Sequence, residues 1–137
     1  MNPGLEQLKQ QVERIAQQID APSGLLPTFG YSLDGAHPHV EGGDAQPFSY
    51  VIVERGQEVS RVVAKDMDDL LYRIFADISF SMAVTYELQH RRGEQDPRRQ
   101  LFAKQESLLG RLQPHWGARR AEEHRLILLQ YPYNDQV

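Results

Sequence analysis

Two histidines and a glutamate alternate along one short stretch, His37-Pro38-His39-Val40-Glu41. If this stretch is a strand, residues 37, 39 and 41 project from one face, and two imidazoles with a carboxylate are ligands that a metal accepts. Three ligands with an open position would suit a small metal-dependent hydrolase. Pro38 and the nearby glycines argue for a loop, and no fourth ligand lies nearby in the sequence. Two exposed loop histidines are therefore the competing interpretation.

The other polar residues form no recognisable catalytic set. The chain has no cysteine, no glycine-rich phosphate loop and no G-x-S-x-G motif. Its acidic pairs, Asp68-Asp69 and Glu122-Glu123, are adjacent residues in expected helices, where neighbouring side chains diverge. The sequence therefore favours a protein that is not an enzyme and holds no cofactor.

Two arginines stand in the first turn of an expected helix that Asp96 caps. There Arg98 and Arg99 oppose the helix dipole, at a typical cost of about 0.3–1 kcal/mol each. We expect an ion pair to compensate, with Asp77 or Glu87 on the preceding antiparallel helix as the partner. The alternative is an arginine that faces another protein.

The element that must position these residues is a long, largely buried helix over residues 66–93. Its apolar residues recur at helical spacing, with Asp66 as N-cap and Gly93 as terminator. An amphipathic helix and a strand meander precede it, and two helices follow. The other expected helices are at 3–20, 96–113 and 117–131, and the expected strands are at 28–33, 37–41, 48–54 and 59–64. The prediction is one α+β domain over 1–137, with an N-terminal helix, an antiparallel meander of three or four strands and three C-terminal helices.

The composition is that of an ordinary globular protein, with 40% hydrophobic and 25% charged residues. We expect a cytoplasmic protein, since the sequence shows neither a secretory signal nor an apolar run of about 18 residues. Residues 1–90 hold 13 acidic and 6 basic side chains, whereas residues 91–137 hold 6 and 9. The acidic part favours a basic partner and opposes nucleic acid.

A nucleic-acid-binding module is the rival that the basic part permits. Its arginines would be the contacts, but they lack interleaved aromatic residues and a known motif, and the net charge of −4 is unfavourable. The residues concerned are Arg91, Arg92, Arg98, Arg99, Arg119 and Arg120.

Several segments together resemble one protein family. They are YVIVERG at 50–56, DMDDLLYRIF at 66–75, FSMAVTYEL at 80–88 and DPRRQLF at 96–102, followed by Gln105 and Trp116. These segments are similar to those of the immunity proteins of bacterial polymorphic toxin systems, specifically the immunity protein sixty-three family. The resemblance is clearest over residues 48–134. The resemblance implies a cytoplasmic α+β inhibitor, encoded beside a toxin, that binds and neutralises it without catalysis.

No functional residue carries over from the family, so the expected contact surface rests on charge. If the toxin is a basic nuclease, the acidic N-terminal part is the natural docking surface, and the chain itself is a monomer or homodimer. The predicted partner-binding residues are Asp34, Glu41, Asp44, Glu54, Glu58, Asp68 and Asp69.

Overall fold

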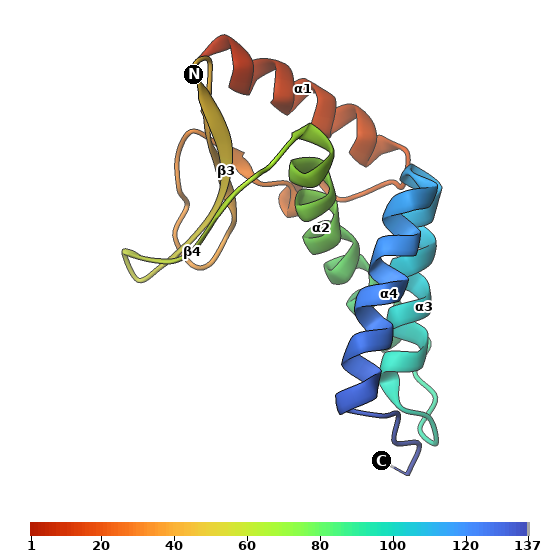
Figure 1. The fold of residues 1–137 in the computed structure, drawn as a ribbon. Coiled ribbons are helices and arrows are strands. Elements are labelled where there is room, and N and C mark those ends of the chain that lie inside the picture. The colour runs from red at the N-terminus through yellow and green to blue at the C-terminus, as the bar shows by residue number, and fades with distance from the viewer. Residues whose placement is uncertain (137) are drawn as a thin grey trace. The chain divides into compact units, whose positions relative to one another are not determined.

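The computed structural model describes residues 1–136 and contains two compact units, divided between residues 74 and 75 (Figure 1). The boundary lies inside helix α2 (Met67–Gln89), so this helix begins in one unit and ends in the other. We call residues 1–74 the sheet unit and residues from 75 onward the helical unit. The predicted α+β class is confirmed. Among the described residues, no helix combines the length and the apolar character that crossing a membrane requires.

The sheet unit contains helix α1 (Pro3–Gln17), a short 3-10 turn η1 (Ser23–Leu25) and a four-stranded sheet of order β1-β2-β3-β4. The strands are β1 (Thr28–Phe29), β2 (His39–Gly43), β3 (Gln46–Glu54) and β4 (Gln57–Val63). β1 is parallel to β2, whereas the other neighbours are antiparallel. The expected all-antiparallel meander is therefore wrong in one detail, because the connection over residues 30–38 returns the chain to the start of β2.

Cross-strand partners assign the residues to the two faces of this sheet. Val40, Tyr50 and Val62 are directly opposite one another and share one face. That face is turned toward α1, because Phe48, two residues before Tyr50, lines a small cavity together with Leu8 of α1. The next row, His39–Val51–Arg61, lies on the opposite face, which we call the outer face, although His39 and Val51 are buried there and only Arg61 is exposed.

Asn2 joins the start of α1 to the sheet. Its Oδ1 accepts a hydrogen bond from Leu5 N at 2.8 Å and so caps the helix, while its Nδ2 donates to Gly42 O at 2.9 Å. Gly42 lies at a β-bulge with φ of +101°, and a Cβ there would be 2.2 Å from Pro47 O. Gly42 and Gly43 are therefore part of β2, and the chain reverses at residues 44–45.

The helical unit contains the second part of α2, then α3 (Pro97–Leu112) and α4 (Pro114–Gln130), which pack against each other (Figure 1). Asp96 caps α3 as predicted, because its Oδ1 accepts from Arg98 N at 2.9 Å. Two predicted bounds are wrong: α2 ends at Gln89 rather than Gly93, and α4 begins at Pro114 rather than Gly117. Proline suits a first helical position because its missing N–H has no partner there.

The core of the helical unit includes an aromatic contact and a close helix crossing. Trp116 stacks on Phe75 with ring centroids 6.1 Å apart, and both side chains are buried. At the crossing of α3 and α4, a Cβ on Gly117 would lie 2.9 Å from the Cα of Gly110. A side chain at Gly117 would force these two helices apart, whereas a Cβ on Gly110 would lie at an ordinary 4.0 Å from Gly117 Cα.

Candidate partner-binding surface

Four ionisable side chains meet on the outer face of the sheet, and we call them the Arg61 cluster: His39, Glu41, Glu58 and Arg61. His39 Nε2 lies 2.7 Å from Glu41 Oε2, and Arg61 Nη2 donates to the other oxygen of Glu41 at 3.0 Å. Arg61 also donates to Glu58 from Nε at 2.8 Å and from Nη2 at 3.0 Å. One guanidinium thus links a carboxylate on β2 to a carboxylate on β4.

A bulge in β4 makes this cluster possible. Ile52 is opposite Ser60, but Val53 is opposite Glu58, so Val59 is an extra residue on β4. Without it, strict alternation would place Glu58 on the face that carries Ser60, turned away from Arg61. The bulge therefore brings Glu58 to the outer face, where it reaches the guanidinium.

The electrostatics of the cluster follow from these hydrogen bonds. The hydrogen bond from His39 lowers the pKa of Glu41, with a further contribution from Arg61 and an opposing one from burial. The hydrogen bond from Arg61 lowers the pKa of Glu58, and the two carboxylates raise the pKa of Arg61. Both glutamates are therefore ionised, and the single positive charge of Arg61 offsets one of their two negative charges. They form a positioned polar surface in which both carboxylates are hydrogen-bonded.

The side chain of His39 is the buried end of this cluster. It is 4% exposed, and its Nδ1 has no hydrogen-bond partner among the described residues. His37 lies outside β2, and its Nε2 is 2.8 Å from Leu26 O. The structure therefore does not bring His37, His39 and Glu41 together, and the described residues contain no group of three or more potential metal ligands. β2 does place His39 and Glu41 side by side, as the metal-dependent hydrolase hypothesis assumes, but His37 does not join them.

The seven acids predicted to bind a partner lie in the sheet unit but do not form one patch. Asp34, Glu54 and Glu58 lie at the β3–β4 turn, where Asp34 Oδ2 accepts from Gly56 N at 2.9 Å. Asp44 is in the β2–β3 turn, at the opposite end of β3.

The remaining three predicted acids have different surroundings. Asp69, which is 5% exposed, accepts from Arg73 Nε at 3.1 Å, and Asp68 precedes it on the surface of α2. Glu41 belongs to the Arg61 cluster. At the β3–β4 turn, Glu54 is exposed and has no ion pair within residues 1–136. Glu54 is therefore the acid best placed to attract a basic partner.

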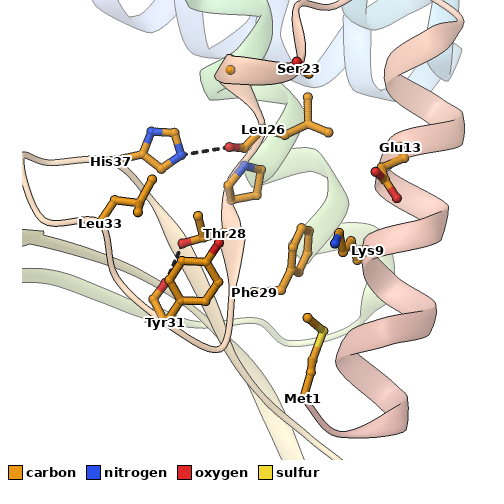
Figure 2. Close-up of a pocket in the computed structure, with 12 residues that line it drawn as sticks. Met1, Lys9, Glu13, Ser23, Leu26, Thr28, Phe29, Tyr31, Leu33 and His37 are labelled. Atoms are coloured by element: carbon orange, nitrogen blue, oxygen red, sulfur yellow. Dashed lines mark hydrogen bonds between the residues drawn. The ribbon is translucent and has the colours of Figure 1, made fainter.

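A pocket of about 260 Å³ lies between α1 and residues 23–37 (Figure 2). Lys9 and Glu13 contribute from α1, while Tyr31 and Leu33 are more than half exposed beside it. Thr28 and His37 could offer polar atoms, but each bonds to a nearby backbone carbonyl (Figure 2). The pocket is therefore mostly apolar, and we assign it no chemistry.

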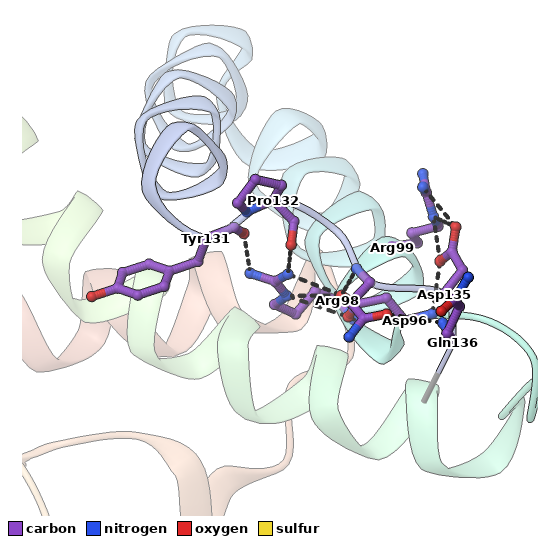
Figure 3. A network of polar contacts seen from close by, with 8 residues as sticks. Asp96, Arg98, Arg99, Tyr131, Pro132, Asp135 and Gln136 are labelled. Carbon is purple, nitrogen blue, oxygen red and sulfur yellow. Dashed lines mark hydrogen bonds and ion pairs between the residues drawn. The ribbon is translucent and has the colours of Figure 1, made fainter.

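The ion pairs expected for Arg98 and Arg99 have different partners (Figure 3). Arg98 Nη2 pairs with Asp96 Oδ2 at 2.9 Å, and Arg99 Nε pairs with Asp135 Oδ1 at 2.9 Å. Glu87 instead pairs with Arg91, which lies two residues beyond the end of α2. Asp77 is exposed on α2 and is not a partner of either arginine within residues 1–136. Both arginines therefore have the expected ion pairs, but the carboxylates come from the N-cap residue Asp96 and from Asp135 in the C-terminal segment.

These contacts bind the segment after α4 to the start of α3, and we call them the C-terminal clasp. Arg98 also donates to the carbonyls of Tyr131 and Pro132, both at 2.8 Å, and Asp96 Oδ2 accepts from Asn134 N at 2.9 Å. The hydrogen bond from Arg98 and the two backbone N–H groups hold the pKa of Asp96 well below its usual range. These two arginines hold the fold together and do not form a free basic patch for nucleic acid.

A buried polar network in the helical unit had no clear signal in the sequence. Gln105 is fully buried; its Nε2 donates to Ala76 O at 2.9 Å, and its Oε1 lies 3.1 Å from both Arg120 Nε and His124 Nε2. His124 Nδ1 is 2.7 Å from Glu106 Oε2. Burial lowers the pKa of His124 and outweighs the opposing effect of Glu106. Only the position of Gln105 among helical apolar residues could have indicated a buried amide.

Comparison with known proteins gives one match. The family model described as Immunity protein 63 matches residues 44–126, which run from the β2–β3 turn into α4. No curated protein and no solved structure matches the chain. The matched region contains β3, β4, α2 and α3. It therefore includes Arg61 on the sheet and Gln105, Trp116 and His124 in the helical unit.

Proposed function

Because the chain belongs to the immunity protein 63 family, we propose that it binds a cognate bacterial toxin and neutralises it by covering its active surface. The family match carries this proposal, and it extends over more than half of the chain. The geometry is compatible with it: the polar clusters are paired internally, and the outer face offers a fixed surface rather than a reactive group. Inhibition by occlusion needs shape and charge complementarity and no chemistry of its own.

We infer that the toxin presents a basic surface, as a nuclease does, and that the complex forms in the cytoplasm. The sheet unit supports a basic partner because residues 1–74 hold 11 acidic and 6 basic side chains, a balance of −5. An excess of one charge accelerates association with the opposite charge, and the effect falls as salt screens it. Glu54 and the Arg61 cluster are the residues that we place at the centre of this contact.

Co-expression with the toxin encoded by the adjacent gene tests the proposal. Cells that produce the toxin should grow only when the chain is also present, and the purified proteins should form a stable complex. Inhibition should be stoichiometric, with complete loss of toxin activity at one equivalent, and the intact mass of the recovered toxin should be unchanged. No complex and no rescue of growth would refute the proposal. Inactivation by a small fraction of an equivalent, with a changed toxin mass, would show an enzyme instead.

A further inference from the structure

We propose that the toxin binds at the open edge of β4. An extended basic segment of the toxin pairs with β4 there and becomes a fifth strand of the sheet. This inference rests on the proposed function and adds the mode of contact. Strand addition to a sheet edge gives affinity through main-chain hydrogen bonds, while the flanking side chains give specificity.

The position of β4 in the sheet leaves this edge available. The strand order is β1-β2-β3-β4, so β4 has β3 on one side and no strand on the other among the described residues. β4 has seven residues, whereas β1, at the opposite edge, has two. Val59 and Val63 are 59% and 57% exposed. The long edge thus combines unpaired main chain with exposed apolar side chains.

The register shows which backbone groups point outward. Ala64 N donates to Phe48 O at 3.0 Å, so the residues of β4 that bond to β3 are Ala64 and, two residues earlier, Val62. The N–H and C=O groups of the alternate residues, Arg61 and Val63, therefore point away from β3. They are the groups that an added strand would meet first.

The usual protection of an edge strand is weak here. Natural edges are commonly guarded by lysine, proline, bulges or charged side chains directed along the edge. β4 contains neither lysine nor proline, and its single cation, Arg61, is bonded across the outer face to Glu41 and Glu58. The bulge at Val59 disturbs only the part of the strand near the turn. The regular part, residues 60–63, remains suited to pairing.

Charge decides which kind of segment fits this edge. Glu54 and Glu58 lie near one end of β4, with Arg55 beside them and Arg61 paired with Glu58, while Asp66 and Asp68 follow the other end after Lys65. The whole sheet unit has a balance of −5. A second copy of the chain would bring an equal negative charge to the same edge, whereas a basic segment would be attracted to it. We therefore assign the edge to the toxin rather than to a homodimer.

The test uses two substitutions at one position, measured against a catalytically inactivated form of the toxin encoded by the adjacent gene. Val63→Pro removes an outward N–H while leaving the β3–β4 hydrogen bonds in place, because proline is tolerated on the open side of an edge strand. Val63→Ala removes most of the side chain and keeps the N–H. Strand addition predicts at least tenfold weaker binding for Val63→Pro and a loss of only a few-fold for Val63→Ala.

Other outcomes overturn the inference in distinguishable ways. Equal losses for both variants would show a side-chain contact without strand pairing, and unchanged binding of both would place the interface elsewhere. A dimer of the free chain that only Val63→Pro dissociates would show that a second copy occupies the edge. No binding by the unaltered chain would refute the proposed function and this inference together.

Hydrogen exchange gives a second readout that does not depend on the folding of Val63→Pro. In the unaltered chain, the amides of Arg61 and Val63 should become protected when the toxin is added, by at least tenfold in exchange rate. The amides of Val62 and Ala64, which already face β3, are internal controls and should change little. Unchanged exchange at Arg61 and Val63 in a formed complex would refute strand addition.

Discussion

The sheet unit and the helical unit use their charged residues in different ways. Residues 75–137 hold 8 acidic and 9 basic side chains and are nearly neutral, whereas residues 1–74 have a balance of −5. In the helical unit the main polar groups are buried: Asp96, Gln105 and His124 are 5% exposed or less. In the sheet unit Glu54 and the three charged members of the Arg61 cluster, Glu41, Glu58 and Arg61, lie partly or fully at the surface, while His39 is buried. The contrast suggests that polar residues maintain the structure in one unit and meet the partner in the other.

The strongest test of this contrast is Gln105→Ala in the helical unit. The change leaves Ala76 O, Arg120 and His124 without their shared partner in a buried place. Since each unsatisfied buried group costs about 1–3 kcal/mol, we expect the free energy of unfolding to fall by about 2–4 kcal/mol. Denaturant unfolding measures it. Toxin affinity, measured where the variant is folded, should be unchanged; a large loss of affinity would place the helical unit in the interface.

The next effect is expected from Asp96→Asn in the C-terminal clasp. Asp96 Oδ1 accepts from Arg98 N and Oδ2 accepts from Asn134 N, and an amide has only one accepting oxygen, so we expect a loss of about 1.5–3 kcal/mol at neutral pH. Because the pKa of Asp96 is lowered in the folded state, its contribution is complete above the unfolded pKa of about 3.9 and is lost as pH falls below it.

Urea titrations at several pH values check both parts of this prediction. The difference between the unaltered chain and Asp96→Asn should be constant above about pH 5 and shrink toward pH 2. Glu122→Gln removes the exposed pair with Arg125 and serves as the control, with no measurable change expected. A difference that grows as the solution becomes more acid would contradict the assignment of a lowered pKa.

A smaller effect is expected where α3 and α4 approach most closely. In Gly117→Ala the new Cβ meets Gly110 Cα at 2.9 Å and Glu106 O at 3.1 Å. Overpacking costs about 1–3 kcal/mol of stability, and the better helix propensity of alanine offsets up to about 1 kcal/mol of this cost. The free energy of unfolding should therefore fall by about 1–2 kcal/mol. Thermal melting measures it, with Gly93→Ala as the control because nothing lies within 4 Å of a Cβ there. Equal melting temperatures for both variants would show that the helices separate without cost.

The smallest effect on stability, and a selective one on binding, is expected for Glu54→Lys at the β3–β4 turn. Glu54 is exposed and lies outside the Arg61 cluster, so melting should not change. The association rate with the toxin should fall several-fold at low salt and approach that of the unaltered chain at high salt. Stopped-flow kinetics provides the measurement, and Glu122→Lys in the helical unit is the matched charge reversal. Equal slowing by both would remove the distinction between the units.

Local patterns were sufficient to predict most elements of the fold. The β3–β4 hairpin follows from apolar alternation on both sides of Arg55-Gly56, and both turn residues have positive φ, as a two-residue turn of type I′ requires. Asp66 and Asp96 were correctly predicted as helix caps. Helix ends were less predictable, since α2 stops four residues before Gly93 and the chain continues without a left-handed glycine.

The surface was less predictable because it depends on contacts distant in the sequence. Arg61 reaches Glu41 across 20 residues, and Arg99 reaches Asp135 across 36. No spacing rule specifies such partners, so arginines expected to bind α2 bind the C-terminal segment instead. A bulge at Val59 cannot be seen in the alternation of β4, yet it decides which face Glu58 occupies.

The connection over residues 30–38 has a consequence for the order of folding. Ala36 N donates to Val53 O, and Gly56 N donates to Asp34 Oδ2, both at 2.9 Å, so this connection is held by the β3–β4 hairpin. The hairpin is local and closes through two residues, while the connection must find it about 20 residues away. The hairpin should therefore form first, and β1 should join the sheet late. Pulse-labelling would show this as earlier amide protection in β3 and β4 than in residues 28–37.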